Sequence, residues 1–374
     1  MREPIGVSAH YTVAMVVALP ILNDAPARPD FAQGPRSLSA VKLLRLSVTD
    51  RCNLRCVYCM PAGGVAFGDR DELLKAEDFI AVARAAKEVG VEHFKVTGGE
   101  PTVRADLLDI IAGLAALKPG DLAMTTNGLL LDRLAFDLKR AGLHRLTVSC
   151  DSLQPDRFER ITRGDRPAAS PLELGGELRG ERDSFRRLMT GLDAACRAGF
   201  TKIKINVVVM GGINDDEVAD FARLTLREDW TVRFIEYMPL GESVLVDDAE
   251  AYLIDNERVK QRIAEELGEL HPVRRESEVG VGPANVFQLA NARGRLGFIS
   301  AMSQPFCETC NRLRLTANGD LRSCLFDGGE VSVLPALAPR PDTDAIIKLM
   351  RRCVAMKPTT HSNRGNRAMS QMGG

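Results

Sequence analysis

The sequence predicts an α/β protein whose core is an incomplete (β/α)6 barrel of the TIM type, with a small C-terminal antiparallel extension that closes the barrel. Three observations support this fold class. Short apolar runs alternate with amphipathic stretches from residue 41 onward. Distinctive polar and cysteine-containing motifs follow the apolar runs. After about residue 283 the pattern changes to short runs separated by turns.

The alternation is typical of βαβ units, in which strands of about six residues alternate with helices of about 10–15 residues in a parallel sheet. The expected strands span residues 41–48, 92–97, 121–126, 145–150, 202–209 and 231–237. The expected helices span residues 76–89, 104–117, 131–141, 184–198 and 215–226. Such units are too few for an eight-stranded barrel, so we expect a partial one.

The distinctive motifs stand at or just after the carboxyl ends of the predicted strands. They are Cys52 to Cys59, Gly98-Gly99-Glu100, Thr125-Thr126-Asn127, Ser149-Cys150-Asp151 and Met238-Pro239. Parallel barrels place their active sites at this face. The sequence therefore predicts one large cavity there.

The C-terminal part contains strand-like runs at 284–290, 295–301 and 312–325. Within the last run, Asn318-Gly319 is a strong signal for a two-residue hairpin turn. These runs predict the small antiparallel extension. Residues 164–183 are rich in Gly, Pro and charged residues, which predicts a solvated loop and not a linker between domains.

We expect three regions along the chain: a flexible tail over 1–38, a partial barrel over 39–240 and a C-terminal region over 241–374. The tail contains an apolar run at 11–22 that superficially resembles a secretory signal peptide. Only Arg2 precedes it, balanced by Glu3, and the run is too short to span a bilayer. We therefore favour a loose tail.

Bulk composition indicates an ordinary globular protein. Hydrophobic residues make up 45%, charged residues 26%, and the net charge is -1. This balance gives no electrostatic reason to expect a nucleic acid or a membrane as partner, so any anion site must be built locally. The nine cysteines form no disulfide framework, and they predict metal ligands in a reducing, cytoplasmic compartment. Three of them, Cys150, Cys196 and Cys353, are expected to be buried thiols that bind no metal.

The first cysteine group, Cys52, Cys56 and Cys59, follows the first predicted strand with the spacing C-x3-C-x2-C. A structural zinc site needs four ligands, and no fourth Cys or His is close in the sequence. Three thiolates suit a four-iron cluster better, because one iron then stays open to chelate a substrate or cofactor. We predict such a cluster, with zinc or a redox dithiol as weaker alternatives.

The second cysteine group is Cys307, Cys310 and Cys324, with the spacing C-x2-C-x13-C. A two-residue turn at Asn318-Gly319 places Leu313 about opposite Cys324, so the cysteines return to the same end of the hairpin. Three thiolates again converge without a fourth ligand. A zinc ribbon is the main alternative, because C-x2-C is also a zinc element.

Arg312 and Arg314 stand between these cysteines. Residues two apart on a strand point to the same face, so the two guanidiniums would form a fork for phosphate oxygens. If the cysteines were not beside them, the two arginines would more simply be read as charged residues on an exposed edge strand. The chain has no G-x4-G-K-[ST] motif, so a Walker-type NTPase is not expected. A triphosphate would have to be held by cations from several strand ends.

Several segments occur in an order that resembles one enzyme family: RLSVTDRCNLRCVYC, TGGEPTVR, TTNG, SCDSL, KIKINVVVM, FIEYMPLG, CETCNRLRLTANGDLRSCL and the final Gly-Gly. From about residue 43 onward they resemble the GTP 3′,8-cyclases, which are radical S-adenosylmethionine (SAM) enzymes of molybdenum cofactor biosynthesis. The first cysteine group and the GGE motif resemble the general radical SAM signature. The second cysteine group and the Gly-Gly are not general features of that superfamily.

The resemblance implies a lyase that uses two [4Fe-4S] clusters and SAM, with GTP as substrate. In this family the first cluster cleaves SAM, the 5′-deoxyadenosyl radical removes the 3′ hydrogen of GTP, and the ribosyl radical attacks C8 of guanine. The product is 3′,8-cyclo-7,8-dihydro-GTP, and the second cluster binds the guanine. The resemblance also implies an electron donor protein, a downstream cyclic pyranopterin monophosphate synthase as the recipient of the product, and a homodimer as one option.

The resemblance assigns roles residue by residue. Cys52, Cys56 and Cys59 would hold the first cluster, and Cys307, Cys310 and Cys324 the second. The SAM contacts would be Tyr58, Gly99, Ser149 and Met238. The GTP contacts would be Arg45, Lys95, Thr125, Lys204, Arg312, Leu313 and Arg314. Catalysis would also involve Arg45 and a C-terminal Gly373-Gly374 pair that enters the active site.

The chain departs from the family pattern at three places. Lys95 stands where the family is expected to have Arg, so the charge is kept but the bidentate geometry is lost. The loop over 164–183 is longer than expected, and Cys150 replaces an apolar residue. Two other functions stay open: a radical SAM enzyme of the peptide-maturase type, and a zinc-stabilised binding protein without catalysis. Metal analysis separates the latter, because two cubane clusters require about eight irons.

Overall fold

The computed structural model describes residues 35–61, 63, 65, 67–69, 72–163, 183–274, 280–327, 330–362, 365 and 369–372. The predicted tail over 1–38 lies outside the described residues except for 35–38. The predicted loop over 164–183 lies outside them except for Asp183, and so does the Gly373-Gly374 pair.

Parallel strands form the centre of the sheet, as the sequence predicts. They are β1 (Leu43–Ser47), β2 (His93–Thr97), β3 (Asp121–Thr126), β4 (Arg145–Ser149), β5 (Lys204–Val209) and β6 (Thr231–Glu236). Each strand pairs in parallel with the next one along the chain. Alternate residues of these strands face the inside of the curved sheet and the helices outside it.

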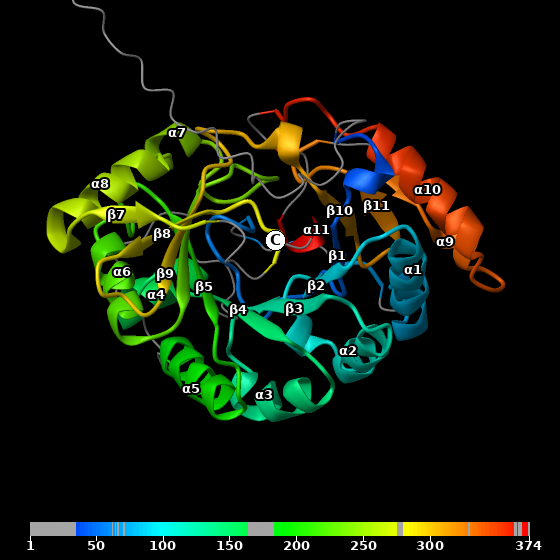
Figure 1. Ribbon diagram of the computed structural model, residues 1–374, viewed down its shortest axis with the longest axis horizontal. Coiled ribbons are helices and arrows are strands. Elements are labelled where there is room, and N and C mark those ends of the chain that lie inside the picture. Colours follow the sequence, from blue (N-terminus) through cyan, green and yellow to red (C-terminus); the bar gives the residue numbers. More distant parts are fainter. Residues whose placement is uncertain are drawn as a thin grey trace, which may run out of the picture.

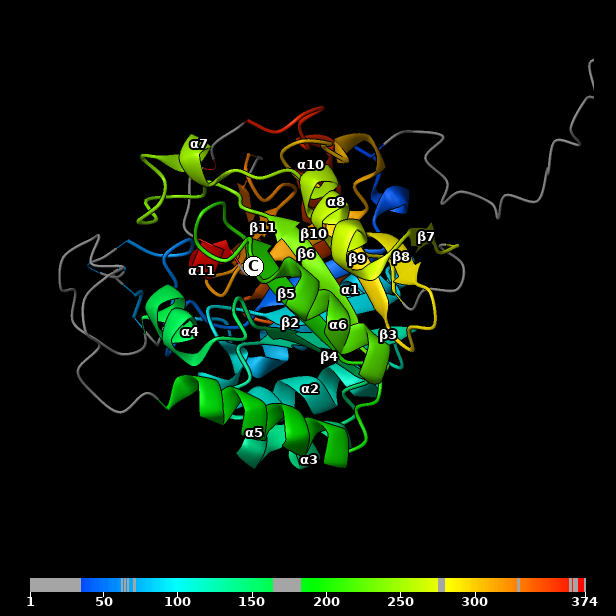
Figure 2. The same cartoon turned by 90° about the vertical axis from the view of Figure 1, so that its left-hand side faces the viewer.

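Most of the helices that connect these strands cover the outer face of the sheet (Figure 1). They are α1 (Ala76–Glu88), α2 (Leu107–Ala116), α3 (Leu131–Arg140), α4 (Pro155–Thr162), α5 (Ser184–Arg197) and α6 (Val218–Arg227). All except α4, which lies at one end of the barrel (Figure 2), correspond to predicted helices. Asp78 accepts a hydrogen bond from the Lys75 N–H (2.9 Å) and so caps the start of α1. The buried residues Phe79, Val82 and Ala86 of α1 recur at helical spacing and pack on the core.

The C-terminal strands extend both edges of the sheet. They are β7 (Leu270–Pro272), β8 (Asn285–Leu289), β9 (Arg295–Ile299), β10 (Arg312–Leu315), β11 (Asp320–Arg322) and β12 (Glu330–Ser332). The strand order is β12-β11-β10-β1-β2-β3-β4-β5-β6-β9-β8-β7. β9 and β10 first add to the sheet in parallel, and the outer strands then pair antiparallel. The antiparallel extension is thus confirmed, but it is split between the two edges and lengthens the partial barrel.

The hairpin β10–β11 is confirmed, but its turn differs from the prediction. Arg314 pairs with Arg322, and the Thr316 N–H donates to the Asp320 carbonyl (2.9 Å). Three residues, 317–319, therefore form the loop. Gly319 has a φ of 92°, the left-handed conformation that closes three-residue hairpin loops. The register shifts by one residue, and Cys324 lies at the level of Arg312 instead of Leu313.

The remaining helices are α7 (Ala249–Tyr252), α8 (Asn256–Leu267), α9 (Leu334–Leu337), α10 (Thr343–Ala355) and α11 (Met369–Met372), with short 3-10 helices at Leu38–Ala40, Pro101–Val103 and Cys307–Thr309. Helix α10 packs on α1 and on β11 and β12. Helix α11 lies inside the ring of strands in Figure 1, and Figure 2 shows the same barrel from the side. Met372, which ends α11, is buried.

One thiol prediction is wrong. Cys150 and Cys353 are buried as expected, but Cys196 is exposed. The buried face of α5 is formed by residues such as Leu188, Leu192 and Ala195. Cys196 follows Ala195 and turns away from this face, because neighbouring residues on a helix point in different directions.

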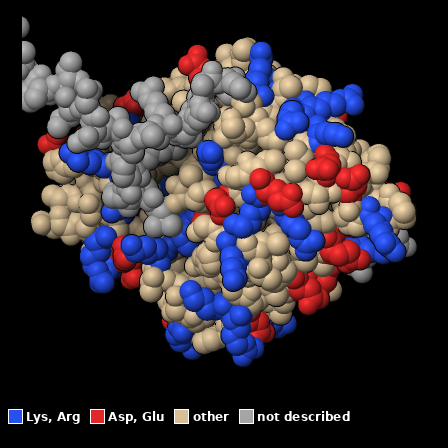
Figure 3. Space-filling view, turned by 45° about the vertical axis from the view of Figure 1, so that its right-hand side comes forward, with Lys and Arg blue, Asp and Glu red and all other residues tan. Residues whose placement is uncertain are grey.

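The surface shows no dominant charge on the face drawn in Figure 3, where basic and acidic side chains intermingle. This agrees with the totals of 49 Lys and Arg against 50 Asp and Glu. Among the described residues, no helix combines the length and apolar character that crossing a membrane requires.

Candidate active site

A cavity of about 310 Å³ lies inside the curved sheet. The cavity runs along the strands. Leu43 and His93, the first residues of β1 and β2, line it at one end, and Gly98 and Met238, which follow β2 and β6, line it at the other. Most predicted site residues line this one cavity: Arg45, Cys52, Cys56, Tyr58, Cys59, Lys95, Gly99, Thr125, Ser149, Lys204, Met238, Cys307, Cys310, Arg312, Arg314 and Cys324. The structure therefore brings both cysteine groups to a common space.

Leu313 is the exception among the described site residues. Its side chain is 1% exposed and packs in the hydrophobic core. Arg312 and Arg314 on either side line the cavity, and successive strand residues face opposite sides of a sheet. The Leu313 side chain therefore does not reach the cavity, and the predicted contact of this residue with substrate would use its main chain.

The loop that carries Cys52, Cys56 and Cys59 is held by the end of helix α4. The N–H groups of Arg55 and Val57 donate to the carbonyls of Thr162 (2.8 Å) and Ile161 (3.0 Å). Arg163, directly after α4, donates to the carbonyls of Arg55 and Met60. These contacts satisfy main-chain groups of an irregular loop and fix its shape.

The Gly98-Gly99 pair lets the end of β2 approach this loop closely. The Gly99 N–H donates to the Thr49 carbonyl (2.7 Å), and the Glu100 N–H donates to the Arg51 carbonyl (2.7 Å). A Cβ atom on Gly99 would lie 2.3 Å from the Arg51 carbonyl oxygen. The glycines are therefore required by the contact between two chain segments, in addition to any approach of a ligand.

Glu100 ties this region to the end of β3. Its carboxylate accepts hydrogen bonds from the Thr102 N–H (3.0 Å) and hydroxyl (2.6 Å), the Thr126 hydroxyl (2.7 Å) and the Asn127 N–H (2.6 Å). Burial raises the pKa of Glu100, and these donors act in the opposite direction. The carboxylate thus positions main chain at the cavity wall.

We expect Gly99→Ala to weaken SAM binding about tenfold or more, because overpacking costs about 1–3 kcal/mol and would displace the loop next to Cys52. The three atoms nearest to the new methyl group would all be main-chain atoms of Asp50 and Arg51. Equilibrium dialysis of the reconstituted protein with SAM under anaerobic conditions measures the effect. Gly63→Ala is the control, because a Cβ there meets nothing within 4 Å. Equal SAM affinity in the two variants would contradict the role given to Gly99.

Tyr58 is oriented by Asp151 from the end of β4. The Tyr58 hydroxyl donates to Asp151 Oδ2 (2.8 Å), and the Val208 N–H donates to Oδ1 (2.8 Å). Burial raises the pKa of Asp151 to about 6, against the effect of these two donors. Because the Tyr58 hydroxyl is hydrogen-bonded to Asp151, the aromatic ring is the part of Tyr58 that is left to contact a ligand in the cavity.

The first cysteine group lies among charges of both signs, the carboxylates of Glu100 and Asp151 and the guanidiniums of Arg55 and Arg163. Burial, followed by the Glu100 carboxylate, raises the pKa of Cys52 to about 12. Burial also raises the pKa of Cys56, with Cys59 and Asp151 acting in the same direction. Thiolates would be costly here without a bound cation or cluster.

The second cysteine group lies among positive charges. Arg312 Nη2 and Lys357 Nζ each lie 3.8 Å from Cys310 Sγ. Burial acts to raise the pKa of Cys310, but Arg312 and then Lys357 outweigh it and lower the pKa to about 7. Arg312 also stacks over the Phe306 ring at 4.8 Å. At Cys310 the cations thus outweigh burial, whereas at Cys52 and Cys56 burial and the carboxylates outweigh the effect of nearby cations.

A row of three cations crosses the cavity wall. Arg45 on β1 pairs in register with Lys95 on β2 and with Arg314 on β10. Burial, followed by repulsion from Arg314, lowers the pKa of Arg45 well below its usual value. Burial and then Arg233 lower the pKa of Lys95, and burial and then Arg312 lower that of Arg314 to about 10. Like charges side by side in a sheet are destabilising, so this row favours a polyanionic ligand.

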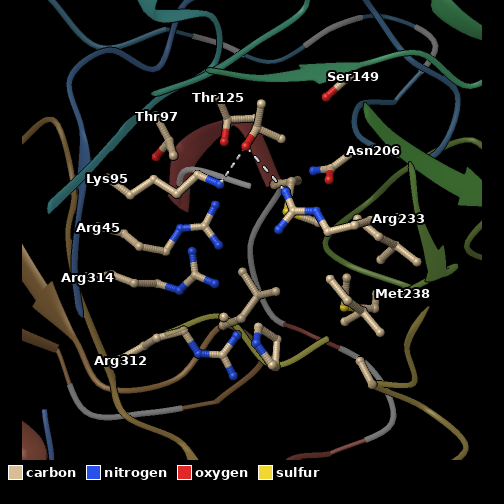
Figure 4. A pocket seen from close by; sticks show the side chains of 18 of the residues that line it. Arg45, Lys95, Thr97, Thr125, Ser149, Asn206, Arg233, Met238, Arg312 and Arg314 are labelled. Atoms are coloured by element: carbon tan, nitrogen blue, oxygen red, sulfur yellow. Dashed lines mark hydrogen bonds between the residues drawn. The ribbon is translucent and has the colours of Figure 1, made fainter. Parts of the chain in front are cut away.

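Arg233 on β6 faces this row from the opposite wall (Figure 4). Thr147 Oγ1 lies between the walls and accepts hydrogen bonds from Lys95 Nζ (3.3 Å) and Arg233 Nη2 (3.3 Å). The buried polar atoms without a hydrogen-bond partner among the described residues include some that belong to cavity-lining residues, such as Thr125 Oγ1, Asn206 Oδ1 and Ser323 Oγ. Buried polar groups are normally satisfied, so these atoms indicate a ligand with polar groups of its own.

The sequence motifs do not include four residues that are close to this site: Asn206, Arg233, Lys357 and His361. A signal existed for Arg233, because a cation stands between apolar residues in the run TVRFIE. His361 lines the cavity and stacks on Phe326 with ring centroids 4.1 Å apart. No local pattern marks His361 or Lys357, since both reach the site from after α10.

The cysteine groups suit iron–sulfur clusters. Among the described residues, no three His, Cys, Asp or Glu side chains are placed to hold a single metal ion. A four-iron cluster differs from zinc in that each thiolate binds its own iron, so three thiols need not meet at one point. The donor set, three cavity-lining thiols in each group, fits such a cluster with one open iron.

Comparisons with known proteins agree with this site. The chain matches the Radical SAM superfamily over residues 46–225 and Molybdenum Cofactor Synthesis C over residues 230–363. The first match defines the class, radical SAM proteins, which implies a [4Fe-4S] cluster and SAM. A GTP 3′,8-cyclase of Moorella thermoacetica is 41% identical over 342 residues, 89% of this chain and 98% of the relative. One of Geobacter sulfurreducens is 43% identical over 324 residues, 86% of this chain and 91% of the relative.

The chain belongs to the GTP 3′,8-cyclase family, so the resemblance seen in the sequence motifs is confirmed. Among solved structures, Streptococcus suis SuiB bound to S-adenosylmethionine has a TM-score of 0.54 and 15% sequence identity. The match covers 80% of this chain and 64% of the SuiB chain. At this identity the likeness shows the fold alone, and it confirms the partial barrel.

Proposed function

We propose that this protein is a radical SAM GTP 3′,8-cyclase that converts GTP to 3′,8-cyclo-7,8-dihydro-GTP in the first step of molybdenum cofactor biosynthesis. One observation carries the proposal: both three-cysteine groups and the cation row line the same cavity. A SAM site, a second metal site and a triphosphate site can therefore serve one reaction. Enzymes of this kind depend on such shared, enclosed spaces to direct a reactive radical.

In this proposal Cys52, Cys56 and Cys59 hold the first cluster. When bound and reduced, such a cluster would supply the electron that cleaves SAM into methionine and a 5′-deoxyadenosyl radical. Tyr58, Gly99, Ser149 and Met238 position SAM, and their place along the cavity wall supports this role. The Glu100 hydrogen bonds and the Tyr58–Asp151 contact keep this wall in place, so the chain holds SAM at one end of the cavity.

The triphosphate of GTP lies against Arg45, Lys95 and Arg314, with Lys204 and Arg233 on the opposite wall. Charge-assisted hydrogen bonds from several strands can hold a polyphosphate without a glycine-rich loop. Thr125 Oγ1 is buried in the described structure without a partner, and it offers a hydroxyl to the ligand. Lys95 provides a point charge in place of the fork that an arginine would provide.

Cys307, Cys310 and Cys324 would hold the second cluster, which would supply an open iron as the binding site for the guanine. This places the base at one end of the cavity and the triphosphate against the cation row. The ribose then lies between the two sites, where Arg45 assists catalysis by fixing the substrate. Orientation of this kind contributes strongly to rate, because misplacement by about 1 Å can cost about 100-fold.

We also propose protein partners and a cellular location for this enzyme. An electron donor protein reduces the first cluster, and a cyclic pyranopterin monophosphate synthase takes the product. A cytoplasmic location fits the cysteine chemistry, and a homodimer is compatible with the chain. We retain residues 39–240 as the radical SAM barrel and 241–374 as the region of the second cluster, with 1–38 as a tail.

The test is anaerobic incubation of the reconstituted protein with SAM, GTP and a reductant, followed by mass analysis of the products. We expect 5′-deoxyadenosine and a product with the mass of the cyclised nucleotide. SAM cleavage that is indifferent to GTP would favour a peptide-maturase type of enzyme. Zinc in place of about eight irons would favour the zinc-stabilised binding protein. Either result would overturn the proposal.

We further propose that Gly373 and Gly374 enter the active site and orient the substrate. Met369 of α11 lines the cavity and Met372 is buried. Two residues of extended chain reach about 7 Å, enough to approach a ligand in that cavity. Residues without side chains can pass through a narrow space.

We expect deletion of Gly373 and Gly374 to lower the cyclisation rate about 100-fold while GTP affinity changes little, because the loss would be one of orientation. Product formation under saturating GTP and binding by dialysis measure the two effects. Gly373→Ala with Gly374→Ala keeps the chain length and shows whether glycine itself is needed. Turnover at the full-length rate after deletion would exclude the role.

A further inference from the structure

Lys357 is a buried lysine that reaches the second cysteine group from outside its sequence motif. It lies just after α10, and its side chain is 3% exposed. Lysine is almost never fully buried unless it is paired. Its position therefore requires a set of acceptors that compensates for the loss of water.

The acceptors all belong to the segment Cys310–Arg312. Lys357 Nζ donates to the carbonyl oxygen of Cys310 (2.9 Å) and to that of Arg312 (3.1 Å). It also lies 3.8 Å from Cys310 Sγ. The three donors of the ammonium group thus match two carbonyls and one sulfur.

The lysine is itself held in place. Arg36 Nε donates to the carbonyl of Lys357 (2.8 Å), and α10 packs on β11 and β12. The ammonium group therefore lies at a defined position behind the cysteine turn. Rigid support of this kind is what positions a metal ligand accurately.

The charges around the two cysteine groups differ. The first group has the carboxylates of Glu100 and Asp151 near it as well as Arg55 and Arg163, whereas two cations, Arg312 and Lys357, lie beside Cys310. One-electron reduction adds a negative charge to a cluster, so nearby cations stabilise the reduced form. Net charge and hydrogen bonds to sulfur are recognised controls of cluster potential.

We propose that Lys357 is a positioning residue for the second iron–sulfur site, which fixes the Cys310–Arg312 segment and raises the reduction potential of the cluster bound there. The inference rests on the proposed function, because it requires a four-iron cluster at Cys307, Cys310 and Cys324. In this role Lys357 acts through Cys310 and makes no contact with the substrate.

The test uses the full-length protein with Cys52, Cys56 and Cys59 replaced by alanine, so that the spectroscopic signal comes from the second site alone. In this background we compare Lys357→Met, Lys357→Arg and Lys348→Met. Lys348 lies on the exposed side of α10 and is the matched control. Iron analysis and a redox titration followed by electron paramagnetic resonance give the cluster content and the midpoint potential.

We expect Lys357→Met to lower the equilibrium constant of reduction about tenfold, a shift of about 59 mV for one electron. Lys357→Arg should stay close to the parent, because it keeps the charge, and Lys348→Met should not differ from it. An unchanged potential in Lys357→Met, or an equal shift in Lys357→Arg, overturns the inference. If Lys357→Met binds no iron, restored iron in Lys357→Arg supports the inference and its absence overturns it.

The background protein separates this inference from the proposed function. If it binds no iron while Lys357 is intact, the second cluster itself is wrong, and the proposed function fails with it. If it binds about four irons and the Lys357 variants behave alike, only the role of Lys357 fails.

Discussion

Replacing Cys56 with alanine is expected to abolish reductive cleavage of SAM, whereas replacing Cys310 is expected to spare that cleavage and stop cyclisation of GTP. Cys56 would hold the cluster that binds SAM, and Cys310 would hold the one that binds the base. Loss of an outer-shell partner already costs about 10–100-fold at metal sites, so loss of a ligand should cost at least that much. The separation follows from the placement of the two cysteine groups in different loops of one cavity.

Quantification of 5′-deoxyadenosine and of the cyclised product in one anaerobic assay measures both effects. Cys353→Ala is the matched control, because this buried thiol lies on α10 and belongs to neither cysteine group. Iron analysis verifies that each variant keeps the other cluster. Equal loss of SAM cleavage in Cys56→Ala and Cys310→Ala, with both proteins folded, would show that the two groups do not act separately.

Arg314→Ala is expected to weaken GTP binding by about 1.5–3 kcal/mol, the scale of a hydrogen bond to a charged group, while guanosine binding changes little. Arg314 is 5% exposed and stands in the cation row with Arg45. Arg312 is expected to act differently. It contacts Cys310 Sγ and stacks on Phe306, so Arg312→Ala should weaken both ligands.

Equilibrium dialysis with GTP, GDP, GMP and guanosine measures the dependence on phosphate. The effect of Arg314→Ala should grow with the number of phosphates, because each adds negative charge near the row. Arg352→Ala, an exposed arginine on α10, controls for net charge. Equal loss of affinity for GTP and guanosine would show that Arg314 supports the fold or the second cluster and does not bind the triphosphate.

Much of the barrel could be predicted from local pattern. The strands β1 to β6 and helices α1, α2, α3, α5 and α6 match the expected ranges closely, because apolar period and length separate strands from helices. Helix α4 was missed, since Pro155–Thr162 is short and polar on most of its surface. The division of the C-terminal strands between the two edges of the sheet was not predicted, because no local signal tells a strand which edge it joins.

The cysteine spacings, the glycine pair and the family motifs were determined by the sequence alone, because each is a short-range pattern with its own chemistry. The row Lys95–Arg45–Arg314 was decided only by tertiary structure, since it depends on the register of three strands. The same holds for Arg233, which faces the row across the barrel, and for Lys357, which is 47 residues from Cys310. The pattern along one strand specifies which of its residues face the core. It does not specify which distant strand lies beside it, and that neighbour is decided by non-local pairing.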